Sequence, residues 1–130
     1  MPTHTATCCC GQLRVTVPGP LPSPSICHCR QCQRRTGSVF GVQMRFPRGQ
    51  VQIEGTSTVF ERRGEGVVTM HFCPTCGSTV YWFLDGLPDS ISVAVGAFAS
   101  REVPPPTFSV YEDRQHPWVV LPDTVTTHWD

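Results

Sequence analysis

Eight cysteines are the residues of this 130-residue chain that are most able to do chemistry. They lie in three short segments, which read CCCG from Cys8, CHCRQC from Cys27 and CPTCG from Cys73. Thiols gathered in this way form either disulfides or a site for a metal ion. The short, repeated spacings are typical of zinc ligands, and cysteines that can converge on one ion are candidates for a shared site.

The CPTCG segment predicts half of a zinc site. Two residues between Cys73 and Cys76 let both thiolates converge on one ion, and Gly77 permits a positive φ angle after the turn. Zinc takes four ligands in a tetrahedron, with Zn–S distances near ~2.3 Å. A buried or redox-active pair is the alternative, but no βαβ pattern of the thioredoxin kind surrounds this segment. The half-site therefore needs two ligands from elsewhere.

Cys8 and Cys10 are predicted to supply those two ligands. In an extended segment, residues i and i+2 point to the same side, so Cys9 between them points away and is a bystander. Two alternatives remain open: Cys8 and Cys10 are free thiols, or Cys9 is a ligand in place of Cys8. A site in which four sulfurs fill every position is structural. Metal binding at such a site contributes directly to folding.

The remaining cysteines, Cys27, Cys29 and Cys32, are close enough in sequence to reach one ion together. Three protein ligands and an open position are typical of a reactive zinc site, where the metal acts on whatever binds the fourth position. The alternative is a second structural site that Cys9, His28 or another histidine closes. We expect His28 to point away from the ion, because it lies between two ligands in an extended segment.

The charge of the chain limits its partners. Ten basic residues, all arginine, balance ten acidic residues. A neutral domain has no electrostatic reason to bind a nucleic-acid backbone or an anionic membrane, so we predict neither partner. No signal peptide or membrane-spanning run is visible, and we expect a cytoplasmic protein. Thiols stay reduced in that compartment, which favours metal ligands over disulfides.

The elements that must position the cysteines are predicted to be short strands. Thirteen prolines and eleven glycines interrupt the chain, and apolar residues alternate with polar ones between them. Strands are expected at 13–17, 40–46, 51–54, 58–62, 67–72, 78–84, 90–95, 107–111 and 118–121. A helical turn is expected at 30–36. The pattern predicts an all-β fold with little helix, in a single zinc-binding domain over residues 1–130. Exposed edge strands make a homodimer plausible.

Three motifs together resemble those of a known family. They are C-x-C-G at Cys8, C-x-C-x-x-C-[QR]-[RK]-x-x-G at Cys27 and F-C-x-x-C-G-[ST] at Phe72, and ISVAVG and WVVL in the tail add weaker support. The set resembles the glutathione-dependent formaldehyde-activating enzyme family, which includes centromere protein V. The resemblance implies a β-tent fold of stacked small antiparallel sheets. It also implies two Zn²⁺ per chain, one structural at the four-cysteine set and one at an active site formed by the other three.

The resemblance further implies a carbon–sulfur lyase activity, the condensation of glutathione with formaldehyde to S-hydroxymethylglutathione. The predicted function is therefore a zinc-dependent lyase that acts on a thiol–aldehyde adduct, with a thiol such as glutathione and an aldehyde as partners. Arginine binds carboxylates bidentately, so Arg30, Arg34 and Arg35 beside the cysteines are candidates for substrate binding. The competing hypothesis is a non-enzymatic, zinc-stabilised protein-binding module in which both metal sites are closed.

Overall fold

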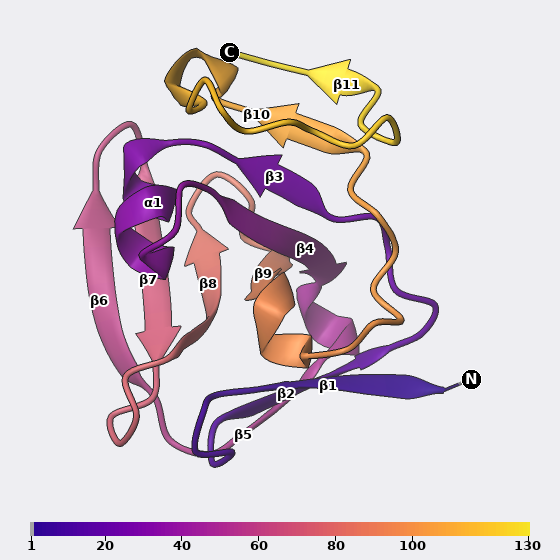
Figure 1. Ribbon diagram of the computed structural model, residues 1–130. Coiled ribbons are helices and arrows are strands. Elements are labelled where there is room, and N and C mark those ends of the chain that lie inside the picture. Colours follow the sequence, from indigo (N-terminus) through magenta and orange to yellow (C-terminus); the bar gives the residue numbers. More distant parts are fainter. Residues whose placement is uncertain (1) are drawn as a thin grey trace.

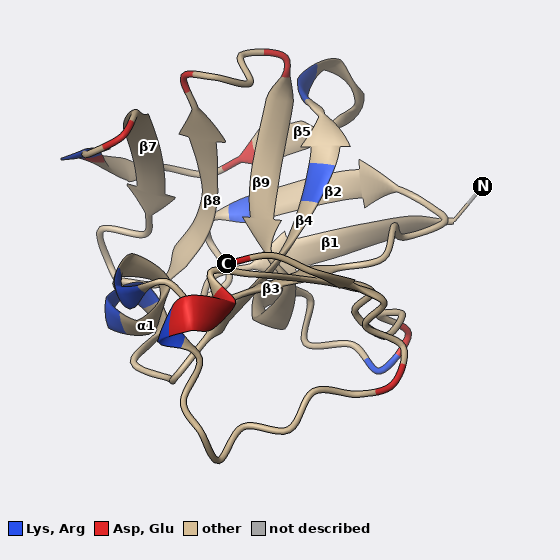
Figure 2. Cartoon of the chain, turned by 90° about the horizontal axis from the view of Figure 1, so that it is seen from above, with Lys and Arg blue, Asp and Glu red and all other residues tan. Residues whose placement is uncertain are grey.

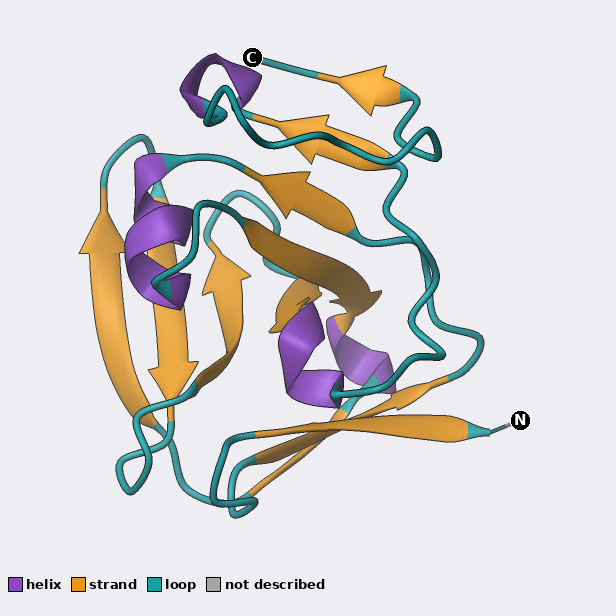
Figure 3. Cartoon of the chain, in the orientation of Figure 1, coloured by secondary structure: helices purple, strands orange, loops and turns teal. Residues whose placement is uncertain are grey.

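A computed structural model describes residues 2–130, and strands dominate it (Figures 1 and 3). The strands are β1 (Thr3–Thr7), β2 (Arg14–Pro18), β3 (Ser25–Cys27), β4 (Gly41–Pro47), β5 (Gln52–Glu54), β6 (Thr58–Arg63), β7 (Val67–Phe72), β8 (Thr79–Leu84), β9 (Ser90–Ala94), β10 (Phe108–Val110) and β11 (Thr127–His128). The helices are α1 (Arg30–Thr36) and the short 3-10 turns η1 (Arg48–Gln50), η2 (Val95–Phe98) and η3 (Glu112–Arg114). The prediction of an all-β fold with little helix is confirmed.

The strands form two sheets. A three-stranded sheet has the order β1-β2-β5, and an eight-stranded sheet has the order β11-β10-β3-β4-β9-β8-β7-β6. Neighbouring strands pair antiparallel, except that β10 runs parallel to both β3 and β11. In Figure 1 the small sheet lies at the bottom of the molecule, and the larger sheet curves from β6 on the left to β11 at the top. None of the helices in residues 2–130 is long and apolar enough to cross a membrane.

The core lies where the small sheet packs against the strands β4, β8 and β9. Val15 and Val17 of β2 are buried, as the alternation with polar neighbours predicted. They join the buried side chains of Met44, Ile91 and Val93 in one cluster. Cys8 and Cys73 belong to the same cluster, so one cysteine group is anchored in the core.

Trp82 and Phe83 occupy adjacent positions in β8 and face opposite sides of the sheet, as expected for consecutive strand residues. Phe83 packs against the main core, and Trp82 packs with Val68 and Ala94 in a second, smaller cluster. Trp82 is only 7% exposed. This second cluster supports the side of the molecule on which α1 lies, because Trp82 also contacts an arginine of that helix.

The single α-helix begins and ends on the residues that the sequence predicted. Cys29 is the N-cap, and its sulfur accepts a hydrogen bond from the backbone N–H of Cys32 at 3.3 Å. Gly37 ends the helix in the left-handed conformation, with φ 72°, and donates its N–H to the carbonyl of Gln33. The helix therefore fixes Cys29 and Cys32 on its first turn, directly after Cys27 at the end of β3.

One predicted strand is wrong. Residues 118–121 form a turn and an extended loop without strand partners. Pro117 and Pro122 flank this segment and lack the N–H groups that a strand ladder needs, which explains why apolar residues there do not pair. Trp118 and Val120 are 69% and 91% exposed. The last strand of the described chain is instead β11.

Candidate metal centres

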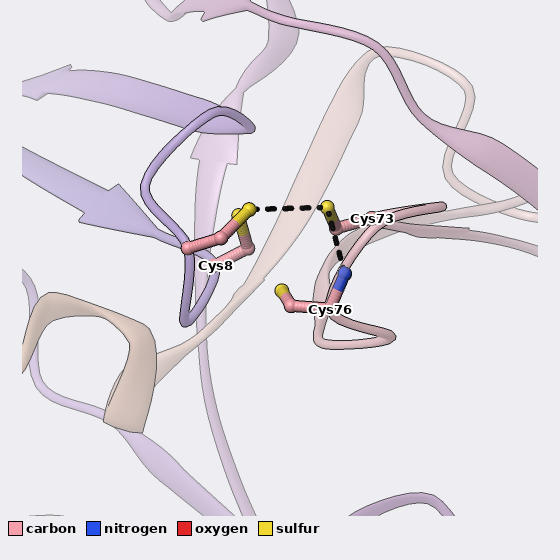
Figure 4. A group of neighbouring side chains, drawn as sticks. Cys8, Cys73 and Cys76 are labelled. Carbon is pink, nitrogen blue, oxygen red and sulfur yellow. Dashed lines mark hydrogen bonds between the residues drawn. The ribbon is translucent and has the colours of Figure 1, made fainter.

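Four cysteines from two distant segments meet at the edge of the core. Cys8 and Cys10 come from the turn between β1 and β2, and Cys73 and Cys76 come from the turn between β7 and β8. Their four Sγ atoms all lie within 4.8 Å of one another. Figure 4 shows Cys8, Cys73 and Cys76 pointing into one space from the two turns.

The sulfur spacing in this four-cysteine cluster fits a zinc ion. The Sγ atom of Cys10 lies 3.6 Å from that of Cys8 and 3.6 Å from that of Cys73. A tetrahedron with Zn–S bonds of ~2.3 Å requires sulfurs about 3.8 Å apart, so only a small adjustment is needed. A set of four thiolates with no other ligand is also the donor set of closed structural zinc sites.

Hydrogen bonds around the four-cysteine cluster favour thiolates at Cys73 and Cys76. The Sγ atom of Cys73 accepts from the backbone N–H of Cys76 at 3.4 Å and from Nε2 of Gln12 at 3.0 Å. Burial raises the pKa of Cys73, but these donors outweigh it and bring the pKa to about 7. The hydroxyl and the backbone N–H of Ser78 lower the pKa of Cys76 to about 5. The protein thus prepares two sulfurs as metal ligands.

Cys9 lies outside this cluster, where the bystander hypothesis placed it. Its side chain is exposed, and its backbone N–H donates to the hydroxyl of Ser78 at 3.1 Å. That bond ties the β1–β2 turn to the β7–β8 turn next to the four sulfurs. Cys9 therefore supports the cluster through its backbone rather than through its thiol.

The second group contains the three remaining cysteines, Cys27, Cys29 and Cys32, whose Sγ atoms also lie within 4.8 Å of one another. Within residues 2–130, no histidine, aspartate, glutamate or further cysteine joins this three-cysteine cluster. Cys27 is buried, whereas Cys29 and Cys32 are half-buried. Three convergent sulfurs with one accessible side are the donor set of a zinc site that keeps an open position.

The three thiols share protons unequally. Hydrogen bonds from the thiols of Cys27 and Cys32, with the N–H of Cys32, lower the pKa of Cys29 to about 2. The bond to Cys29 is also the main cause that raises the pKa of Cys27. The hydrogen bonds within the metal-free cluster thus favour negative charge on Cys29, and the remaining thiol protons must leave when a metal ion binds.

His28 is turned away from the three-cysteine cluster. Its Nε2 atom shares a hydrogen bond of 3.0 Å with the hydroxyl of Ser109, and both residues are fully buried. Burial lowers the pKa of His28, so the ring is neutral near pH 7. The ring thus joins the connection between β3 and α1 to β10, as a packed core residue rather than a ligand.

Cys29 also lines a cleft of about 450 Å³ between α1 and the β6–β7 hairpin. The cleft is rich in arginine, and Figure 2 shows the blue arginine positions gathered on α1. The arginines that line it are Arg30, Arg34, Arg62, Arg63 and Arg114. Tyr111 and the acidic residues Glu65 and Asp85 complete its polar wall. The cleft is therefore suited to an anionic molecule that also carries a positive group.

The structure separates the three arginines that the sequence singled out. Arg30 and Arg34 line the cleft with Cys29, whereas Arg35 is not part of this lining and packs against Trp82. Sequence reasoning missed Arg62, Arg63 and Arg114, because β6 and η3 lie far along the chain from the three cysteines. Arg62 and Arg63 belong to the β6–β7 hairpin. Only the pairing of β6 with β7 brings them to the cleft, and no local spacing signals that approach.

Comparison with known proteins agrees with this picture. A Rhodobacter sphaeroides protein of known crystal structure is similar in fold, with a TM-score of 0.60 and 18% sequence identity. The match covers 97% of this chain and 99% of that one. Among proteins with curated descriptions, none matches the sequence. The profile of the glutathione-dependent formaldehyde-activating enzymes matches residues 3–114, and the chain thus belongs to this family.

Proposed function

We propose that the protein is a zinc-dependent carbon–sulfur lyase that makes or breaks the bond between a thiol and an aldehyde carbon. One observation carries this proposal: Cys29 belongs to a cluster of three convergent thiols and also lines a cleft with five arginines. A metal-binding group and a site for an anionic molecule therefore adjoin each other. The family membership supports glutathione and formaldehyde as the reactants.

The two cysteine clusters have different roles in this proposal. The four-cysteine cluster holds a structural Zn²⁺, and its ligands tie the N-terminal segment to the β7–β8 turn. The three-cysteine cluster holds the reactive Zn²⁺. When bound there, zinc supplies a Lewis acid with one open position, which lowers the pKa of a thiol that enters it.

The residues of the cleft bind and orient the thiol substrate. Glutathione carries two carboxylates and one ammonium group. The arginines, among them Arg34 and Arg62, bind the carboxylates, and Glu65 and Asp85 offer partners for the ammonium group. A volume of about 450 Å³ is within the ordinary range for small-molecule sites. This binding holds the sulfur atom of glutathione beside Cys29, so the reaction no longer depends on a chance encounter in solution.

The proposed reaction is an addition that needs no oxidant. The thiol sulfur forms a bond to the carbonyl carbon of the aldehyde, and the thiol proton ends on the carbonyl oxygen. The reverse reaction breaks the carbon–sulfur bond and returns the proton to sulfur. No disulfide joins any of the cysteines in residues 2–130, which is consistent with the reducing cytoplasm in which we place the protein.

A non-enzymatic binding module is the second candidate. It requires that both metal sites are closed by four protein ligands. Residues 2–130 supply four sulfurs at one cluster but only three at the other. This difference favours the enzyme.

The test is thiol-dependent aldehyde consumption by the zinc-loaded protein. We expect the wild type to accelerate the reaction of glutathione with formaldehyde, and Cys29→Ser to lose that acceleration. Cys9→Ser is the matched control, because Cys9 is exposed and outside both clusters. Equal rates for Cys29→Ser and the wild type would refute the proposed role of the three-cysteine cluster.

A further inference from the structure

The guanidinium group of Arg35 is held at a fixed place behind the three-cysteine cluster. Arg35 follows Cys32 by three positions on α1, so the two side chains lie on the same face of the helix. The Cζ atom of Arg35 lies 4.3 Å from the centre of the Trp82 ring. Because Trp82 is buried and belongs to β8, this cation–π contact fastens the helix to the sheet.

Part of this guanidinium is buried without a hydrogen-bond acceptor. The Nη2 atom of Arg35 is shielded from solvent, and nothing in residues 2–130 accepts its hydrogens. The ion pairs in the described chain do not include Arg35 either. A buried N–H group that donates no hydrogen bond is costly, and the Trp82 ring does not accept from this edge of the guanidinium as an anion would, so a compensating negative charge nearby would stabilise it.

The cysteine cluster is a source of negative charge beside this nitrogen. Gly41 of β4 is the register partner of Cys27, and its missing side chain leaves a small space beside the cluster. A Cβ atom at position 41 would lie 2.7 Å from Nη2 of Arg35 and 3.6 Å from Sγ of Cys32. The unpaired guanidinium nitrogen and the sulfur therefore border the same space. A side chain at position 41 would displace the guanidinium nitrogen, whereas glycine leaves it beside the sulfur.

The charges of the loaded cluster need such a cation. Three thiolates and one divalent ion leave a net charge of −1, and a thiolate at the open position makes it −2. Cys27 is buried and Cys32 is half-buried, so water screens this charge only in part. The arginines of the cleft face the substrate side, and Arg35 is absent from that lining. Arg35 thus adds positive charge beside the cluster from outside the lining of this cleft.

We propose that Arg35 is the built-in counter-cation of the three-cysteine centre, a positioning residue that stabilises its negative charge when metal is bound. This inference rests on the proposed metal at that cluster. It gives Arg35 a role different from that of Arg30 and Arg34, which contact the substrate cleft. Groups that orient metal ligands from outside the coordination shell commonly change metal affinity by ~10–100-fold.

The test is release of zinc to a coloured chelator from the fully loaded protein, which contains its own reference. Release of zinc from the two clusters is followed as two kinetic phases. The phase that is missing in Cys29→Ser belongs to the three-cysteine cluster, and the phase of the four-cysteine cluster is the internal reference. For Arg35→Met we expect about tenfold weaker retention at the three-cysteine cluster and unchanged retention at the other. Arg35→Lys keeps the charge and recovers most of the loss. Arg45→Met, an exposed arginine on β4, is the matched control.

Three outcomes would overturn the inference. Arg35→Met that retains zinc like the wild type shows that the charge is not needed. Equal weakening at both clusters shows that Arg35 only supports the fold. Arg35→Lys that behaves like Arg35→Met shows that packing, not charge, is responsible. A wild-type chain that binds no metal at the three-cysteine cluster would instead refute the proposed function as well, so the two failures are distinguishable.

Discussion

Gln12 donates a hydrogen bond from Nε2 to the Sγ atom of Cys73, at 3.0 Å. The same side-chain amide bonds both backbone groups of Thr56, donating to its carbonyl at 2.8 Å and accepting from its N–H at 2.9 Å. Gln12 thus links the turn that carries Cys8 and Cys10 to the opposite half of the four-cysteine cluster. Its donor is also one of the causes that keep the pKa of Cys73 low.

We predict that Gln12→Glu weakens metal binding at the four-cysteine cluster by about tenfold. The substitution keeps the size of the side chain but replaces the donor to sulfur with a carboxylate oxygen, which repels the thiolates and the carbonyl of Thr56. Zinc competition with a chelator measures the change. Gln52→Glu, on the exposed face of β5, is the control. Equal zinc affinity in Gln12→Glu and the wild type would refute this role of the amide.

Ser109→Ala is predicted to lower the free energy of unfolding by about 1–2 kcal/mol. The hydroxyl of Ser109 is the partner of His28 Nε2, and both side chains are fully buried. Removal of the hydroxyl leaves a second ring nitrogen unpaired, since Nδ1 already lacks a partner. Urea denaturation of zinc-loaded protein measures the change. The exposed Ser38→Ala serves as the control, and a similar loss in both variants would contradict the argument.

Arg34→Met is predicted to raise the KM for glutathione about tenfold and to leave kcat nearly unchanged, because a charge-assisted bond to a carboxylate contributes to binding rather than to bond making. The neutral thiol 2-mercaptoethanol provides the internal comparison, since it has no carboxylate to lose. Steady-state rates with both thiols measure the difference. If the KM values for the two thiols rose together, the cleft arginines would not be carboxylate-binding residues.

Removal of all metal is predicted to lower the midpoint of thermal unfolding by more than about 10 °C, because the four-cysteine cluster links two segments that are sixty residues apart. Mild chelation that removes only one zinc per chain should change the midpoint little, because the three-cysteine cluster loses its metal before the four-cysteine cluster does. Calorimetry with parallel zinc analysis checks both expectations. Stripped protein with the midpoint of the loaded form would show that neither centre is structural.

The local parts of both clusters could be predicted from the sequence. Cys73 with Cys76 and Cys29 with Cys32 are joined by single turns, so their spacing alone determines that the sulfurs converge. The helix over residues 30–36 followed from the absence of Gly and Pro between the cysteines and Gly37. These features depend on contacts within a few residues, where chain geometry leaves little choice.

Features that depend on tertiary packing were not predictable. Arg62 and Arg63 reach the cleft only because β6 pairs with β7, and Arg35 leaves the substrate side only because Trp82 offers a buried ring. The expected strand at 118–121 failed for a related reason: its apolar residues have the composition of a strand but find no partner between two prolines. Apolar composition indicates that a segment is able to form a strand, but the neighbouring segments determine whether it finds a pairing partner.

The proposed activity depends on a metal ion at the three-cysteine cluster that keeps an open position for a thiol. The most direct measurement is the absorption spectrum of cobalt-loaded protein during titration with glutathione. We predict that the sulfur-to-cobalt charge-transfer band grows and saturates at one glutathione per chain, and that S-methylglutathione leaves it unchanged. A spectrum that glutathione does not alter, in protein with two cobalt ions per chain, would contradict the claim.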